Sequence, residues 1–245
     1  MFSTSIRYVR AAACLAALVV GFGLAGCEGD SSDAALFLLL GVIRPNNNSS
    51  SDSGGSANPA VTGDYGSNNP NVYVAVGDSI TLGANKPYPP YPERLAALLG
   101  KTVINAAKSG ESAASGAQRM GSILAQYKPG HLLILYGINE TRGGAGAAAG
   151  AESVRSIVRQ AKSNKTVPVV ATYYLMAADS TGFNPGIREI NQDLRAMASQ
   201  EGVTLVDLEA AFGSNDINLL YLPEGFHPND AGTRLVARAF AAVLQ

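Results

Sequence analysis

Apolar residues gather in five short runs in the second part of the chain, separated by stretches in which apolar and polar positions recur with helical spacing. The runs occupy residues 72–77, 102–106, 131–137, 167–174 and 203–208. Several are rich in β-branched residues, and continuous apolar runs of this kind are typical of strands buried on both faces. They predict five strands of one sheet.

Between and after these runs, apolar side chains recur every three or four positions within residues 154–161, 187–197 and 235–243, which predicts three amphipathic helices. Pro92 and Gly100 bracket a fourth, because proline favours a helix start and glycine a helix end. Strands that alternate with helices predict an α/β fold, a three-layer α/β/α domain around a parallel sheet. Such sheets bind ligands beyond the carboxyl ends of their strands, so the residues that follow each strand are the candidates for chemistry.

The first part of the chain has a different pattern. Arg7 and Arg10 precede an apolar stretch that ends in LAGC at residues 24–27, which is the order of a signal peptide. LAGC resembles the lipobox of bacterial lipoproteins. That resemblance implies that residues 1–26 are cleaved and that Cys27 carries a lipid, so that the protein is exported and anchored in the bacterial cell envelope, on the periplasmic or cell-surface face. The alternative is an ordinary cleaved signal that ends near a cysteine.

The residues after Cys27 form two further segments before the predicted domain. The apolar segment 34–43 is about half the length that spans a bilayer, so it either lies on the membrane beside the anchor or packs on the domain. Residues 44–71 are rich in Asn, Ser, Gly and Pro and predict a flexible linker. We therefore divide the chain into a signal peptide (1–26), an anchored linker region (27–71) and one folded domain (72–245).

Composition narrows the class of protein. The chain is 47% hydrophobic and 15% charged, which is typical of a globular domain with a sizeable core. Its net charge of −1 gives no reason to expect a nucleic acid partner. Of the two cysteines, Cys14 lies in the signal peptide, so Cys27 has no partner for an internal disulfide. None of these patterns sets the oligomeric state.

Reactive side chains follow the predicted strands. GDSI places Ser79 just after the first strand, a tight loop after the second contains Gly110, and GINE after the third contains Asn139. His227, one of two histidines, precedes the last helix, with Glu224 three positions before it. Each residue alone is ordinary for a turn, a loop or a helix start. Together they are the parts of an acyl-transfer site at one edge of the sheet.

The chemistry of acyl transfer explains why these residue types belong together. A serine hydroxyl is a poor nucleophile until a neighbouring base takes its proton. Imidazole, with a free pKa of about 6.5, suits that role at neutral pH. A carboxylate behind the imidazole fixes its tautomer, and N–H donors stabilise the oxyanion that forms when the hydroxyl attacks.

GDSI, the Gly110 loop, GINE and EGFHPN are similar, in this order, to the four sequence blocks of the SGNH (GDSL-type) hydrolase family, and the resemblance covers residues 72–245. It implies that Ser79 is the nucleophile, that His227 is the general base and acid, and that the oxyanion is held by the N–H groups of Ser79 and Gly110 and by the Asn139 amide. It also implies a flavodoxin-like strand order of 2-1-3-4-5 and no metal or organic cofactor. The implied substrates are small-molecule carboxylic esters with short acyl, aryl, lipid or sugar groups.

Two positions depart from the family pattern. The family places Asp three residues before the histidine, where this chain has Glu224. Glutamate keeps the charge and lengthens the reach, so we expect Glu224 to orient His227, with Asp207 at the end of the fifth strand as the rival. Glu140 stands where the third block usually ends in Asp, and we expect it to shape the loop.

Other functions are compatible with parts of this pattern. The same residues would transfer an acyl group from an acylated glycan or lipid to a glycan, and a surface lipoprotein could keep the fold and bind a glycan or partner without turnover. Gly144-x-Gly146-x-x-Ala149 matches a dinucleotide-binding fingerprint, but it begins several residues after the strand and lacks the acid that binds ribose about 20 residues on. A flexible loop beside Asn139 is the better interpretation.

Two further features have an ordinary structural interpretation. His131 is isolated in an apolar strand, which indicates a core residue rather than a metal ligand. Residues 173–176 (YYLM) either line an acyl or aryl pocket or belong to the sheet core.

Overall fold

The computed structural model describes residues 61–245 except 84–85, 143, 145, 177–181 and 214–219. The predicted signal peptide, Cys27 and the apolar segment 34–43 lie outside the described residues. No helix in the described part of the chain has the length and apolar character needed to cross a membrane.

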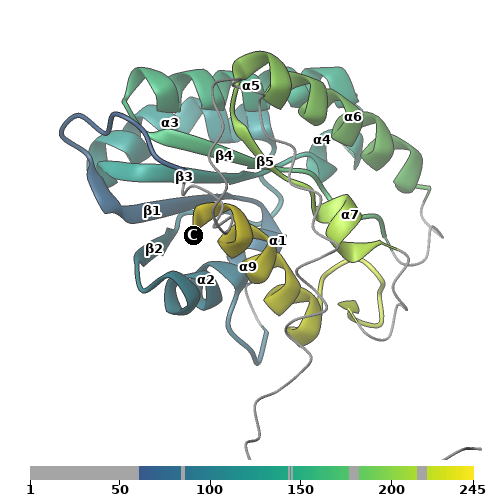
Figure 1. Cartoon of the computed structure of the whole chain (residues 1–245). Helices are drawn as coiled ribbons and strands as arrows, with labels where there is room; N and C mark the ends of the chain where they lie inside the picture. Colours follow the sequence, from purple (N-terminus) through teal and green to yellow (C-terminus); the bar gives the residue numbers. More distant parts are fainter. Residues whose placement is uncertain (1–60, 84–85, 143, 145, 177–181, 214–219) are drawn as a thin grey trace, which may run out of the picture.

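Five parallel strands form one sheet with the order β2-β1-β3-β4-β5 (Figure 1), which confirms the predicted fold and the strand order implied by the family. The strands are β1 (Asn69–Gly77), β2 (Thr102–Asn105), β3 (Pro129–Leu135), β4 (Val167–Ala171) and β5 (Thr204–Val206).

Helices cover both faces of the sheet, with α3, α5 and α6 on one face and α2 and α9 on the other (Figure 1). The helices are α1 (Ser79–Leu82), α2 (Tyr91–Leu99), α3 (Ala113–Tyr127), α4 (Ile138–Arg142), α5 (Ala147–Ser163), α6 (Asn184–Glu201), α7 (Leu208–Phe212) and α9 (Asp230–Leu244). The four helices expected from sequence correspond to α2, α5, α6 and α9. The periodic apolar side chains of α2 and α9 pack in one core and those of α5 in the other, while α6 contributes Ile187 to the first and Ile190, Leu194 and Met197 to the second.

Four predicted strands run past the observed strand ends, by one to three residues, among them those predicted to end at residues 137 and 174. The chain leaves the sheet after Leu135 and Ala171, but Tyr136, Tyr173 and Tyr174 beyond these ends are still buried. An apolar run therefore marked burial correctly and overestimated strand length. Residues 173–176 belong mainly to the core, since Tyr173, Tyr174 and Met176 are at most 4% exposed.

Helix α3 was not predicted, because its buried face is made partly of small residues. At Gly116, a Cβ atom would lie 2.6 Å from the Tyr136 hydroxyl oxygen, so glycine is needed for α3 to pack this closely on the sheet. A glycine on the buried face weakens the helical pattern in the sequence while serving the packing.

Residues 61–68, which composition placed in the linker, contact the amino-terminal end of the sheet. The Val61 carbonyl accepts from His131 Nε2 at 2.9 Å, and Asn68 Nδ2 donates to the Asn164 carbonyl at 2.6 Å. His131 is 2% exposed and stacks on Tyr73 at 4.2 Å, and burial lowers the pKa of its imidazole. Within the described residues, no three His, Cys, Asp or Glu side chains are grouped to hold a metal ion.

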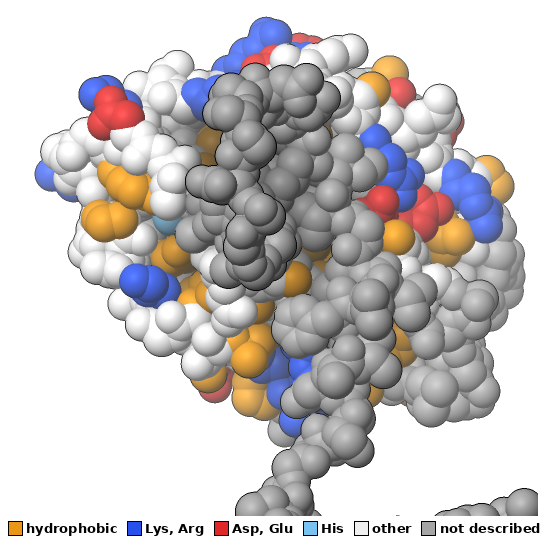
Figure 2. Space-filling view, viewed as in Figure 1, with side chains coloured by type: hydrophobic (Ala, Val, Ile, Leu, Met, Phe, Trp, Pro, Cys, Tyr) orange, Lys and Arg blue, Asp and Glu red, His pale blue; other side chains and the backbone are white. Residues whose placement is uncertain are grey.

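In Figure 2, some Lys and Arg side chains lie beside Asp or Glu side chains and others stand apart from them. Arg155 and Arg159 on α5 both pair with Glu201 on α6, at 3.2 and 2.9 Å. The Arg159 side chain is 62% exposed, so its ion pair is worth about 1 kcal/mol or less.

Candidate active site

Ser79 is the first residue of α1, and only Asp78 separates it from the end of β1. Asp78 caps this short helix, since its Oδ1 accepts from the Ile80 N–H at 3.0 Å. A Cβ atom at Gly77 would lie 2.5 Å from the Leu135 carbonyl oxygen on β3. The GDS sequence thus has a local structural reason: glycine lets two strand ends approach, aspartate begins the helix, and serine is the first side chain beyond the sheet.

His227 contacts Ser79, although 148 residues separate them in the chain. Ser79 Oγ lies 3.2 Å from His227 Nε2, and His227 Nδ1 lies 2.9 Å from Glu224 Oε1. Because an ionised carboxylate can only accept, Nδ1 carries the ring hydrogen and Nε2 accepts from the serine hydroxyl. This is the arrangement in which a base can activate a hydroxyl nucleophile.

A compact turn holds the histidine in place. The Leu222 N–H donates to the His227 carbonyl at 2.9 Å, and the Tyr174 hydroxyl donates to the Phe226 carbonyl at 3.1 Å. Tyr174 lies in the core beyond β4, so the turn that carries His227 is tied to the carboxyl edge of the sheet.

Glu224 is partly exposed, with 45% of its side chain accessible, yet the pKa of its carboxyl is lowered. Burial acts to raise this pKa, but hydrogen bonds from its own backbone N–H and from His227 outweigh that effect. Glu224 is therefore ionised at neutral pH, as an acceptor for the Nδ1 hydrogen must be.

Asp207, the rival partner for His227, is engaged elsewhere. Its carboxylate accepts from Arg195 at 2.9 and 3.0 Å, and from the Thr172 hydroxyl and the Ala210 N–H, both at 3.0 Å. Burial acts to raise the pKa of Asp207, but the Arg195 and Ala210 hydrogen bonds hold it below its ordinary value. These contacts serve the junction of β5, α6 and α7, so the geometry favours Glu224 as the partner of His227.

Asn139 lies in α4, whereas the sequence suggested a loop. Its Nδ2 donates to the Glu111 carbonyl at 3.0 Å and to Asp78 Oδ2 at 3.2 Å. Both partners are acceptors, which fixes the orientation of the amide. Because Glu111 follows Gly110 and Asp78 precedes Ser79, these bonds join three of the four predicted blocks at the carboxyl edge of the sheet.

Gly110 adopts φ +72°, a left-handed conformation that favours glycine, in the loop after β2. The Glu111 N–H closes this turn on the Lys108 carbonyl at 3.2 Å. The Glu111 carboxylate accepts from Arg119 Nε and from the Tyr136 hydroxyl, each at 2.6 Å. Sequence reasoning did not identify this anchor, because it joins α3, an unpredicted helix, to the end of β3.

The geometry can be compared with known proteins. A model of the GDSL-like lipase/acylhydrolase family matches residues 75–235, a span that includes both Ser79 and His227. This chain belongs to the GDSL-like lipase/acylhydrolase family. It is accordingly an enzyme of ester hydrolysis. No curated protein matches the sequence in a direct comparison.

Solved structures share the fold of this GDSL-like hydrolase. A lipolytic protein of the G-D-S-L family from Desulfitobacterium hafniense DCB-2 is 20% identical, with a TM-score of 0.59 over 71% of this chain and 99% of its own. The structure named TesA is 23% identical, with a TM-score of 0.59 over 70% and 97%. Axe2, an acetylxylan esterase from Geobacillus stearothermophilus, is 21% identical, with a TM-score of 0.61 over 71% and 93%.

Glu140 has a structural position in this GDSL-like hydrolase. Its Oε1 accepts from the Ala113 N–H at the start of α3, and the residue is 3% exposed. Burial raises the pKa of its carboxyl. Glu140 therefore ties α4, which carries Asn139, to the start of α3, close to the loop-shaping role expected from sequence.

The glycine-rich segment around Gly144 is only partly a loop. Helix α5 begins at Ala147, so Ala149 of the predicted loop lies in the first turn of this helix. Helix α4 separates Gly144 and Gly146 from β3. The strand-turn-helix context that binds a dinucleotide is therefore not formed by this segment.

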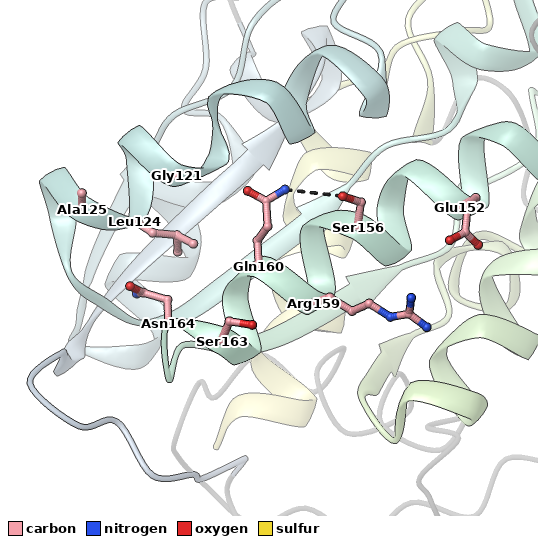
Figure 3. A pocket seen from close by; sticks show the side chains of 9 residues that line it. All are labelled: Gly121, Leu124, Ala125, Glu152, Ser156, Arg159, Gln160, Ser163 and Asn164. Carbon is pink, nitrogen blue, oxygen red and sulfur yellow. Dashed lines mark hydrogen bonds between the residues drawn. The ribbon is translucent and has the colours of Figure 1, made fainter.

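Two hollows differ in their relation to Ser79. A small cavity of about 10 Å³ at the site is lined by Ser79, Ile80, Gly83, Lys86, Tyr88, Pro90, His227, Pro228 and Thr233. A wider groove of about 620 Å³ lies between α3 and α5, and Figure 3 shows the side chains that line it, among them Glu152, Arg159 and Gln160. None of the candidate active-site residues lines this groove, so its size does not mark the place of the chemistry.

Proposed function

We propose that this GDSL-like hydrolase is a serine esterase that cleaves carboxylic esters through an acyl-enzyme on Ser79. The observation that carries the proposal is the continuous hydrogen-bonded sequence from Ser79 Oγ through His227 to Glu224, with contacts of 3.2 and 2.9 Å. A serine hydroxyl that is hydrogen-bonded to an imidazole, whose other nitrogen is held by an ionised carboxylate, has the arrangement that activates a serine nucleophile.

In the first half of the proposed reaction, Ser79 Oγ attacks the ester carbonyl carbon while its proton passes to His227 Nε2. Glu224 stabilises the imidazolium. The carbonyl oxygen becomes an oxyanion, bound by the N–H groups of Ser79 and Gly110 and by the Asn139 amide. Collapse breaks the bond to the alcohol oxygen, which takes the proton from Nε2 and leaves. Water then repeats the sequence on the acyl-enzyme and releases the acid.

The Asn139 amide must exchange a partner during this cycle. Both hydrogens of its Nδ2 are engaged, one with Asp78 and one with the Glu111 carbonyl. Donation to an oxyanion therefore requires one of these bonds to be shared or released. An oxyanion is the stronger acceptor, and one such donor is worth about 3–4 kcal/mol in the transition state.

Turnover of p-nitrophenyl esters from acetyl to octanoyl tests this function directly. The purified domain should hydrolyse the short esters, because the Ser79 hydroxyl lies within hydrogen-bond reach of the His227 imidazole that can take its proton. Acetylated xylo-oligosaccharides, thioesters and lysophospholipids in the same screen define the substrate class. Absence of turnover on every ester would contradict the proposal.

We also propose that Cys27 attaches the enzyme to the cell envelope, a proposal supported by the LAGC sequence and the signal-peptide pattern before it. Bacteria that express the full chain in the presence of labelled palmitate should incorporate label into it. Cys27→Ala should lose the label and release the protein from the membrane fraction, whereas Cys14→Ala serves as the matched control. Equal labelling of the two variants would contradict attachment at Cys27.

A further inference from the structure

A buried carboxylate connects the nucleophile to the amide proposed to bind the oxyanion. Asp78 is completely buried, and its two oxygens accept three hydrogen bonds. Oδ1 accepts from the Ile80 N–H at 3.0 Å, while Oδ2 accepts from Asn139 Nδ2 at 3.2 Å and from the Tyr173 hydroxyl. Tyr173 has no part in the proposed reaction, yet it contacts the same oxygen atom that anchors Asn139.

We infer that Tyr173 is a positioning residue for ester hydrolysis, whose hydroxyl orients the Asp78 carboxylate so that Asp78 anchors the Asn139 amide beside Ser79. This inference rests on the proposed function, because the position of Asn139 matters to rate only if an ester is attacked at Ser79. Tyr173 acts through two other residues and does not itself touch the substrate.

Hydrogen bonds to the Asn191 side chain hold both backbone polar groups of Tyr173 in place. Its backbone N–H donates to Asn191 Oδ1, and its carbonyl accepts from Asn191 Nδ2, both at 2.7 Å. The same Nδ2 also donates to Glu209 Oε2 at 3.0 Å. Since Asn191 and Tyr173 are both 0% exposed, a paired amide on α6 sets the backbone from which the phenol reaches Asp78.

The charge of Asp78 depends on its neutral donors. Burial raises the pKa of Asp78 to about 6, although hydrogen bonds from Tyr173 and from the Ile80 N–H act to lower it. The other titratable groups that interact with this carboxylate through their charges are Glu140, Tyr91 and Tyr174. Removing the Tyr173 hydroxyl therefore raises the pKa of Asp78 further. A protonated Asp78 has one oxygen that donates, and it is then a poorer acceptor for Asn139.

Tyr173→Phe keeps the ring in the core and removes only the hydroxyl. For p-nitrophenyl acetate at neutral pH we expect kcat to fall about tenfold with KM changed less than about twofold, since the lost bond goes to a charged group and affects mainly the transition state. The deficit should shrink as the pH rises, because Asp78 ionises again. The ratio of variant to wild-type kcat is compared at each pH, so that any pH dependence common to both proteins cancels.

A double-mutant cycle separates positioning from general damage. Asn139→Ala should lower kcat about 100-fold. The combined Tyr173→Phe/Asn139→Ala variant should be no slower than Asn139→Ala alone, because Tyr173 acts through the amide that is already absent. Tyr91→Phe is the control: it removes another buried phenolic hydroxyl from the same core, one that makes no hydrogen bond within the described residues, and should leave kcat unchanged.

The outcomes distinguish the two proposals. A wild-type enzyme without activity on any ester overturns the proposed function. If the wild type is active and Asn139→Ala is slow, three results overturn the role of Tyr173. The loss of kcat in Tyr173→Phe could add fully to that of Asn139→Ala, or it could stay constant with pH. The third is a Tyr173→Phe variant as fast as Tyr91→Phe.

Discussion

Ser79→Ala should lower kcat for p-nitrophenyl acetate by at least about 10⁴-fold, the largest effect expected of any single substitution in this enzyme. Alanine retains the backbone N–H proposed to face the oxyanion but removes the atom that forms the acyl-enzyme. Steady-state kinetics on the purified domain measure the loss. KM should change little, because the hydroxyl contributes to bond formation more than to substrate binding.

A matched serine provides the control for this variant. Ser156 is exposed on α5 and lines the groove between α3 and α5 (Figure 3), away from the candidate site. Ser156→Ala should retain wild-type kcat. A Ser79→Ala enzyme with more than about a tenth of wild-type kcat would contradict the acyl-enzyme mechanism, since an acyl-enzyme cannot form without the Ser79 hydroxyl.

The second large effect concerns the two candidate carboxylates. Glu224→Gln should lower kcat about 10³-fold, because an amide can donate to Nδ1 and stabilise the wrong tautomer of His227, and because the imidazolium loses its counter-charge. Asp207→Asn should lower kcat less than about tenfold, since Asp207 binds Arg195, Thr172 and the start of α7. Its main effect should be on the free energy of unfolding.

Comparison of kcat with stability for these two variants decides the assignment. Urea unfolding should show Asp207→Asn to be less stable, because a partly buried ion pair with Arg195 loses its charge, and Glu224→Gln to be nearly unchanged, because Glu224 is half exposed. Glu224→Asp, which restores the residue usual in the family, should recover part of the activity. If Asp207→Asn proved the slower enzyme, Asp207 would replace Glu224 as the orienting residue.

The strand pattern predicted where side chains would meet, because parallel strands end at one edge of their sheet. Ser79, Asn139 and His227 lie in separate segments, and the structure brings Ser79 to 3.2 Å from His227 and links Asn139 to Asp78 beside Ser79. The pattern predicted the order of the strands along the chain and the polar residues at their ends, and neither prediction requires knowledge of how the side chains pack.

The supporting contacts could not be predicted in the same way. The bond from Tyr173 to Asp78 joins residues 95 positions apart, and it requires a phenol just beyond the end of β4 to point toward the end of β1. Tyr173 was equally consistent with core or pocket in the sequence. Glu111 was hidden for a related reason, since its partner Arg119 lies on α3, whose small residues weakened the helical pattern.

Intact-mass and peptide mass spectrometry of the enzyme after reaction with a fluorophosphonate test the central claim most directly. The wild-type domain should take up one equivalent on the peptide that contains Ser79, in parallel with loss of esterase activity. Ser79→Ala should take up none, and His227→Ala should react far more slowly, because the hydroxyl then lacks its base. An active enzyme that remains unlabelled at Ser79, or that is inactivated by label on another residue, would contradict Ser79 as the nucleophile.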